Sequence, residues 1–203
     1  MDNKKIIIIV VIFSLILLSV VGTYAFFTAK VNSVENALTA STAKFTISLD
    51  INGIYTNVDL IPMADNLAVI GFENDCVDDN DFNVCQVYSI ELENNSGTGQ
   101  DERLYGTINF NLRNVKNLSY MLLEEDKTIY KNATSITSGV NLSLGNYVNL
   151  HDGESKLFYL IVWLSDSGDD QTHDDVNGRF DASITYTGVT GDDLSSMITG
   201  TIN

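Results

Sequence analysis

The sequence predicts an all-β protein that folds as a two-sheet antiparallel β-sandwich of jelly-roll-like type. Three observations lead to this prediction. Val, Ile, Phe, Tyr and Thr are abundant, while Gly, Asn, Asp and Ser punctuate the chain and Pro62 is its single proline. Apolar and polar residues alternate over several short stretches. Beyond the N-terminal apolar segment, no stretch has the length and period of a long helix.

Alternation is clearest at residues 44–51, where every second side chain from Phe45 to Ile51 is apolar, as in a half-buried strand. The Asn52–Gly53 pair that follows is a strong hairpin turn signal. A short apolar run at 67–72 leads into an acidic loop. Further strands are expected at 87–92, 104–112, 118–123, 128–131, 147–150, 156–164 and 178–187.

Residues 156–164 form the most apolar run after the N-terminus. The run is short for a helix and rich in branched and aromatic residues, so a central strand of the sandwich is expected. The polar residues 165–177 are expected to separate two core strands. Residues 191–203 contain little apolar material and are expected to form a tail.

The N-terminal segment has the pattern of a secretory signal peptide, with a basic region, an apolar region and small residues at the cleavage site. Lys4 and Lys5 precede the apolar residues 6–21, and the small residues Thr23 and Ala25 follow. Cleavage is therefore predicted between Ala25 and Phe26. An uncleaved anchor is the alternative, because extension through residues 22–29 would bring the apolar stretch to the roughly 20 residues that span a bilayer. The lysines stay on the cytoplasmic side in either case.

The domain organisation follows from these segments. We expect a signal peptide at 1–25, an N-terminal arm at 26–41, one sandwich domain at 42–190 and the tail at 191–203. The arm is mixed in period and is either extended or a short helix.

The net charge of −16 restricts the partners of this chain. A strongly anionic surface repels nucleic acid and anionic lipid, so neither is expected as a partner. Contact with a membrane is expected only through an uncleaved leader.

The two cysteines, Cys76 and Cys85, are expected to form a disulfide, because exported proteins meet an oxidising environment. A metal site needs more ligands than these two residues supply, and the two histidines lie far away in the sequence.

The acidic loop between the cysteines is the sharpest local feature of the chain. Asp79, Asp81 and Asn83 have the spacing of the start of an EF-hand. The loop is not an EF-hand, because Val84 stands where glycine is required and Ile90 where glutamate is required. A looser calcium site is one interpretation, and a solvated acidic hairpin tip held by the disulfide is the other. The acidic residues 166–175 present the same two alternatives. No other cofactor is expected.

No motif for nucleophilic, zinc-dependent or phosphoryl-transfer chemistry is present. His151 follows a strand candidate and precedes a turn, and His173 lies in an acidic loop, so both are expected to be solvated surface residues. The protein is therefore not expected to be an enzyme.

Three segments together resemble a known family. Residues 22–27, Gly-Thr-Tyr-Ala-Phe-Phe, resemble the processing site of exported proteins that are cleaved by the SipW-type signal peptidase. Residues 36–47 are similar to the first segment of mature TasA and camelysin proteins. Residues 158–164 and 178–186 look like the last strand pair of that family.

This resemblance implies a jelly-roll subunit of an extracellular biofilm matrix fibre, secreted to the matrix or cell surface of a Gram-positive-type bacterium. Its partners would be the signal peptidase and other copies of itself. The copies would join head to tail by donor-strand exchange, in which the mature N-terminal arm enters the sheet of a neighbour. The implied anchors of the donor strand are Phe26, Phe27, Val31, Val34 and Leu38.

Some camelysin relatives have been described as metalloproteases, but this chain lacks a zinc-binding motif. The alternative function is a membrane-tethered binding module of the cell surface, with calcium as a stabilising ligand.

Overall fold

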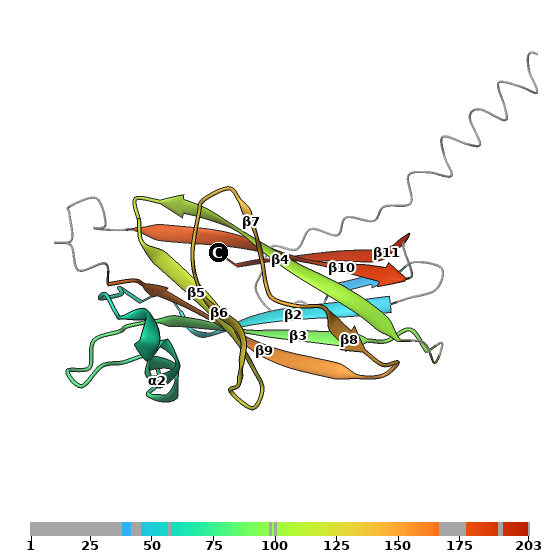
Figure 1. Ribbon diagram of the computed structural model, residues 1–203, viewed down its shortest axis with the longest axis horizontal. Coiled ribbons are helices and arrows are strands. Elements are labelled where there is room, and N and C mark those ends of the chain that lie inside the picture. The colour runs from blue at the N-terminus through green and yellow to red at the C-terminus, as the bar shows by residue number, and fades with distance from the viewer. Residues whose placement is uncertain are drawn as a thin grey trace, which may run out of the picture.

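Two antiparallel sheets pack face to face in the computed structural model (Figure 1). The structure describes residues 38–41, 46–56, 58–97, 99, 101–166, 178–190 and 193–202. One sheet has six strands in the order β1-β2-β3-β9-β5-β6. The other has the order β11-β10-β4-β7, with β8 also paired to β4. The predicted two-sheet antiparallel sandwich is confirmed.

The strands of the six-stranded sheet are β1 (Leu38–Ser41), β2 (Thr46–Tyr55), β3 (Gln86–Asn94), β5 (Leu118–Glu124), β6 (Ile129–Ser135) and β9 (Ser155–Leu164). Those of the second sheet are β4 (Glu102–Arg113), β7 (Asn141–Ser143), β8 (Val148–Leu150), β10 (Arg179–Thr190) and β11 (Asp193–Ile202). Two short helices, η1 (Asp65–Leu67) and α2 (Ala68–Glu73), lie between β2 and β3. Strands distant in the sequence, such as β3 and β9 or β4 and β10, are neighbours, so the chain crosses repeatedly between the sheets.

The main core lies between the two sheets. Every second residue of β4 points into it, as the alternating burial of this strand shows. The Tyr120 hydroxyl of β5 crosses this core and donates a hydrogen bond to the Ser143 carbonyl of β7 at 2.8 Å. The fully buried large side chains of this core include Ile47, Ile90, Leu92, Leu104, Ile108, Phe110, Leu122 and Tyr186.

A second core covers part of the outer face of the six-stranded sheet. Residues 58–85, here called the lobe, contain η1, α2 and the cysteine loop, and α2 lies on the side of the sheet away from β4 and β10 (Figure 1). The lobe packs on outward side chains of β5 and β9, and the Trp163 Nε1–H donates to Asp65 Oδ1 at 2.9 Å. Burial on both faces explains the long apolar runs in the sequences of β5 and β9.

Three expectations about the ends of elements are wrong. The Asn52–Gly53 pair does not form a hairpin turn, because β2 continues to Tyr55 with a register shift after Gly53. Glycine is common in β-bulges as well as in turns, so the Asn52–Gly53 pair marks an irregularity within β2 and not the end of the strand. The sandwich also begins before residue 42, because β1 pairs with β2.

The expected tail at 191–203 is the third error. Residues Asp193–Ile202 form β11, which pairs with β10, and Ile198 and Ile202 are buried. These two isoleucines face the main core, and Gly200 between them lets the backbone of β11 lie close to the Ile51 side chain. The sandwich therefore extends to Ile202.

Neither helix in the described residues combines the length and apolarity needed to cross a membrane.

Burial of Ile198 on β11 predicts that Ile198→Ala destabilises the protein. Loss of this buried side chain should lower the free energy of unfolding by about 2–5 kcal/mol, because a cavity remains in the main core. Thr199→Ala changes the next residue, which points outward, and should cost under about 1 kcal/mol. Denaturant unfolding of both variants provides the measurement, and equal small effects would mean that β11 does not pack as described.

Candidate functional site

The lobe contains the predicted disulfide, which the structure confirms. Cys76 and Cys85 are bonded, with their Cα atoms 5.0 Å apart, and both are buried. The Val84 N–H also donates to the Cys76 carbonyl at 2.9 Å. The bond therefore closes a compact loop against the six-stranded sheet.

Asp78 organises the acidic loop between the cysteines. Its Oδ1 accepts hydrogen bonds from the Asn80 and Phe82 backbone N–H groups, both at 2.9 Å. These donors, above all the Phe82 N–H, hold the pKa of Asp78 below its ordinary value. Asp78 is not among the residues predicted for this loop, although an aspartate whose side chain binds the backbone two residues on is a recognised turn signal.

The three residues considered for calcium do not form a recognisable cation cage. Asp79 and Asp81 are exposed, and Asn83 forms an isolated bridge with Val77. Across the described part of the chain, no three His, Cys, Asp or Glu residues are grouped so that they could hold a metal ion. Calcium binding at Asp79, Asp81 and Asn83 stays a prediction.

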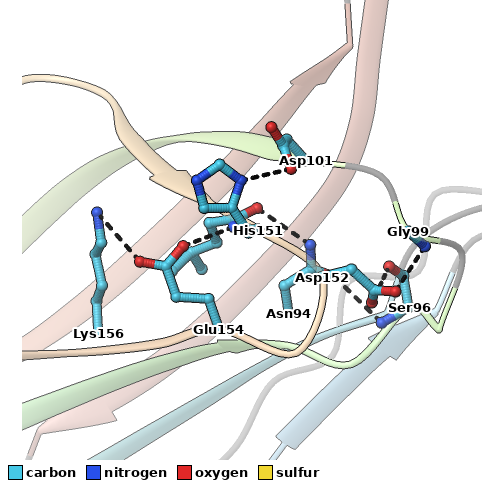
Figure 2. Close-up of polar contacts among 9 residues, drawn as sticks. Asn94, Ser96, Gly99, Asp101, His151, Asp152, Glu154 and Lys156 are labelled. Atoms are coloured by element: carbon cyan, nitrogen blue, oxygen red, sulfur yellow. Dashed lines mark hydrogen bonds and ion pairs between the residues drawn. The ribbon is translucent and has the colours of Figure 1, made fainter.

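A polar cluster joins the loop after β3 to the turn before β9 (Figure 2). Asp152 accepts hydrogen bonds from the Ser96 hydroxyl at 2.9 Å and from the N–H groups of Gly97 and Gly99 at 2.8 and 2.6 Å. The Gly99 N–H is the largest cause of a lowered pKa of Asp152. Beneath it, the buried Asn94 side chain donates to the Leu150 carbonyl at 3.2 Å. This cluster fixes two loops at one end of the sandwich.

His151 is part of the same cluster. Its Nδ1 lies 2.7 Å from Asp101 Oδ1, and its backbone N–H donates to Glu154 Oε2 at 2.7 Å (Figure 2). Glu154 also lies 3.7 Å from Lys156 Nζ. The side chains of His151 and Asp101 are exposed, as expected for His151, so their ion pair contributes little to stability. No local sequence signal joins these two residues, which are 50 positions apart.

A surface pocket of about 520 Å³ lies where the turn after β5 meets the start of β9. Aromatic residues such as Tyr130 and Phe158 form part of its wall, and carboxylates such as Asp126 line it. Asp126 accepts hydrogen bonds from the Thr128 hydroxyl and N–H, which hold its pKa below the ordinary value. A general acid needs a raised pKa, so the environment of Asp126 does not suit that role.

The edge of the six-stranded sheet is the feature that best suits an interaction. Among the described residues, β1 pairs with β2 from Thr46 to Leu49. From Asp50 to Tyr55, β2 pairs with β3 on one side, and no strand of the described residues pairs with its other side. We call residues 50–55 the open edge. Unpaired N–H and C=O groups of such an edge are a template for another strand.

Most residues that the sequence implicated in assembly lie outside the described residues. These are the cleavage pair Ala25 and Phe26 and the anchors Phe27, Val31 and Val34. Leu38 is described, and it pairs with Leu49 of its own chain. Leu38 is therefore occupied within its own sheet.

The Asp101–His151 pair predicts a measurable titration. The hydrogen bond that the protonated His151 ring donates to the Asp101 carboxylate raises the pKa of His151, so the pair stabilises the native state below the ordinary pKa of about 6.5. This contribution is lost as the pH rises through the native pKa. Asp101→Asn should return the pKa of His151 toward its ordinary value in an NMR titration, whereas Asp50→Asn on β2 should leave it unchanged. An unchanged pKa in Asp101→Asn would contradict the pairing.

No protein-family model matches this chain, and no curated protein matches it. Among solved structures, the chain is similar to the N-terminal domain of PorA, with a TM-score of 0.30 and 8% identity over 58% of this chain and 75% of that one. It is also similar to a family 123 glycoside hydrolase from Clostridium perfringens that hydrolyses glycolipid glycans, with a TM-score of 0.30 and 9% identity. That match covers 76% of this chain and 27% of the hydrolase. Both scores are too low to support an argument about function.

Proposed function

We propose that this protein is a structural subunit of an extracellular fibre, joined to its neighbours by strand exchange at the open edge of β2. The observation that carries the proposal is the edge of β2. β2 has ten residues, and the described residues of β1 pair with Thr46 to Leu49, so residues 50–55 have no partner on this side among the described residues. An extended segment that pairs there would satisfy backbone groups and add a strand to the sheet.

The donor in this proposal is the arm of another copy, residues 26–37. Twelve extended residues span at most about 40 Å, which is enough to reach and follow a six-residue edge. Because the donor and the acceptor are different surfaces of one chain, the contact is heterologous and does not close into a dimer. Repetition of such a contact gives a filament.

The exported location and the cleavage after Ala25 belong to the same proposal. A charge of −16 is compatible with a secreted protein, and a buried disulfide is compatible with an oxidising environment. Cleavage would free the arm from the membrane. A retained leader would keep the arm tethered and would favour the alternative role of a surface-bound module.

Deletion of residues 26–37 tests the donor. The protein, purified in the form that cells export, should polymerise, and the shortened form should unfold at the same temperature but remain monomeric. Electron microscopy and sedimentation distinguish these states. Filaments from the shortened form would show that the arm is not the donor. A monomeric exported protein would show that the arm does not join copies, which would contradict the proposed assembly.

Ile54→Lys tests the acceptor. Ile54 lies on the open edge with 43% of its surface exposed, and a lysine on an edge strand opposes pairing with another strand. The yield of sedimentable polymer should fall by about tenfold or more, which corresponds to about 1.4 kcal/mol per contact.

Ile129→Lys is the matched control for this substitution. Ile129 lies on β6, the opposite edge strand of the same sheet, and is 51% exposed. This variant should polymerise like the unchanged protein. Equal losses in the two variants would indicate a general effect of added charge and would contradict assembly at the open edge.

A further inference from the structure

The outer face of the five-stranded sheet differs in charge from the rest of the molecule. The chain has three arginines, and all of them lie on strands of this sheet. Arg103 and Arg113 occupy outward positions at the two ends of β4, and Arg179 pairs with Arg113 from β10. Asp181 is the one carboxylate among the described outward side chains of this face. It forms an ion pair with Arg113, whose Nη2 lies 2.6 Å from Asp181 Oδ2.

The centre of this face is uncharged and polar. Hydroxyls and amides pair across its strands, as between Thr185 and Thr199 at 2.9 Å and between Asn109 and Asn141 at 2.8 Å. No helix of the described residues packs on it, but Tyr147 of the loop before β8 does, with its ring centroid 5.5 Å from that of Tyr105 and 3.9 Å from the Arg103 guanidinium carbon. The outward residues between the arginines are Tyr105, Thr107, Asn109, Asn111, Ser183, Thr185, Thr187, Met197, Thr199 and Thr201.

The opposite side of the molecule is anionic. Between Lys44 and Arg103 the sequence contains twelve Asp and Glu residues and no Lys or Arg. Ten of these carboxylates, from Asp50 to Glu93, lie in β2, the lobe and β3, on the side of the six-stranded sheet, whereas Glu102 begins β4. Asp50 lies directly opposite Glu91 on the outer face of that sheet, and Glu93 follows on the same face. Cross-strand carboxylates of this kind repel each other and favour a cationic neighbour.

The positions of the charges also correspond along the strands. β3 and β4 are joined by the short connection 95–101, so Glu91 and Glu93 lie at the same end of the sandwich as Arg103. Arg113 and Arg179 lie at the other end, where β9 reaches the lobe with its acidic cysteine loop (Figure 1). A second copy that is translated perpendicular to the sheets would place arginines over carboxylates at both ends.

We propose that the arginine-bearing outer face of the five-stranded sheet binds the acidic outer side of the six-stranded sheet of a second copy. This contact stacks copies sideways and is independent of strand exchange at the open edge. Donor and acceptor faces lie on opposite sides of the sandwich, so the contact does not close and can repeat. Charge complementarity of exposed groups gives register and specificity, and salt weakens it because the Debye length is about 10 Å at 0.1 M.

The test uses the exported protein that carries Ile54→Lys, which limits end-to-end growth. Light scattering and sedimentation should show association at about 0.02 M NaCl that disappears at about 0.5 M. Arg103→Gln with Arg179→Gln should weaken the association by about tenfold while keeping the Arg113–Asp181 pair intact. Lys127→Gln with Lys131→Gln makes the same change in net charge on β6 and the turn before it, and should have little effect.

A charge exchange identifies the partner surface. Arg103→Glu with Arg179→Glu should abolish association, as should Glu91→Arg with Glu93→Arg, and all four substitutions in one chain should restore it. Association that is insensitive to salt, equal effects of the arginine and lysine pairs, or no restoration would each overturn the proposal. If Ile54→Lys still forms end-to-end filaments, the acceptor edge of the proposed function is wrong, but the salt and charge-exchange results still decide the sideways contact.

Discussion

Burial of the six-stranded sheet on both faces is the constraint on which the rest of the structure depends. The central strands β5 and β9 carry apolar side chains on both sides, and neither side can be left in water without a large loss of hydrophobic stabilisation. The five-stranded sheet covers one face and forms the main core. The lobe covers part of the other face and forms the second core.

The disulfide and the polar contacts of the lobe follow from this requirement. A helix of six residues and a cysteine loop are too small to fold alone, so they need the sheet as much as the sheet needs them. The bond between Cys76 and Cys85 restricts the unfolded lobe, and Asp65 attaches it to Trp163 of β9. The acidic loop is thereby held at the surface, where its carboxylates stay solvated.

Two surfaces have little or no cover from the described residues. Among these residues, β1 pairs with β2 only as far as Leu49, and the outer face of the five-stranded sheet carries no lobe. The first surface offers backbone groups and the second offers arginines among neutral polar side chains. The two proposed contacts between copies each use one of these surfaces, the first through backbone pairing and the second through charge. A filament that also associates sideways would combine them.

The sequence by itself determined the fold class and most strands, because alternation of apolar and polar residues and the residues typical of turns are local signals. It also determined the disulfide, because two cysteines of an exported chain are expected to be oxidised. The turn predicted at Asn52–Gly53 is wrong because glycine occurs both in bulges and in turns. The tail predicted at 191–203 is wrong because β11 forms only through pairing with β10 and close contact of Gly200 with Ile51. Only the tertiary structure brought Asp101 to His151, placed Asp78 rather than Asp79 at the centre of the cysteine loop, and gathered three dispersed arginines on one face. Such groupings depend on strand order and register across the whole chain, which local patterns do not contain.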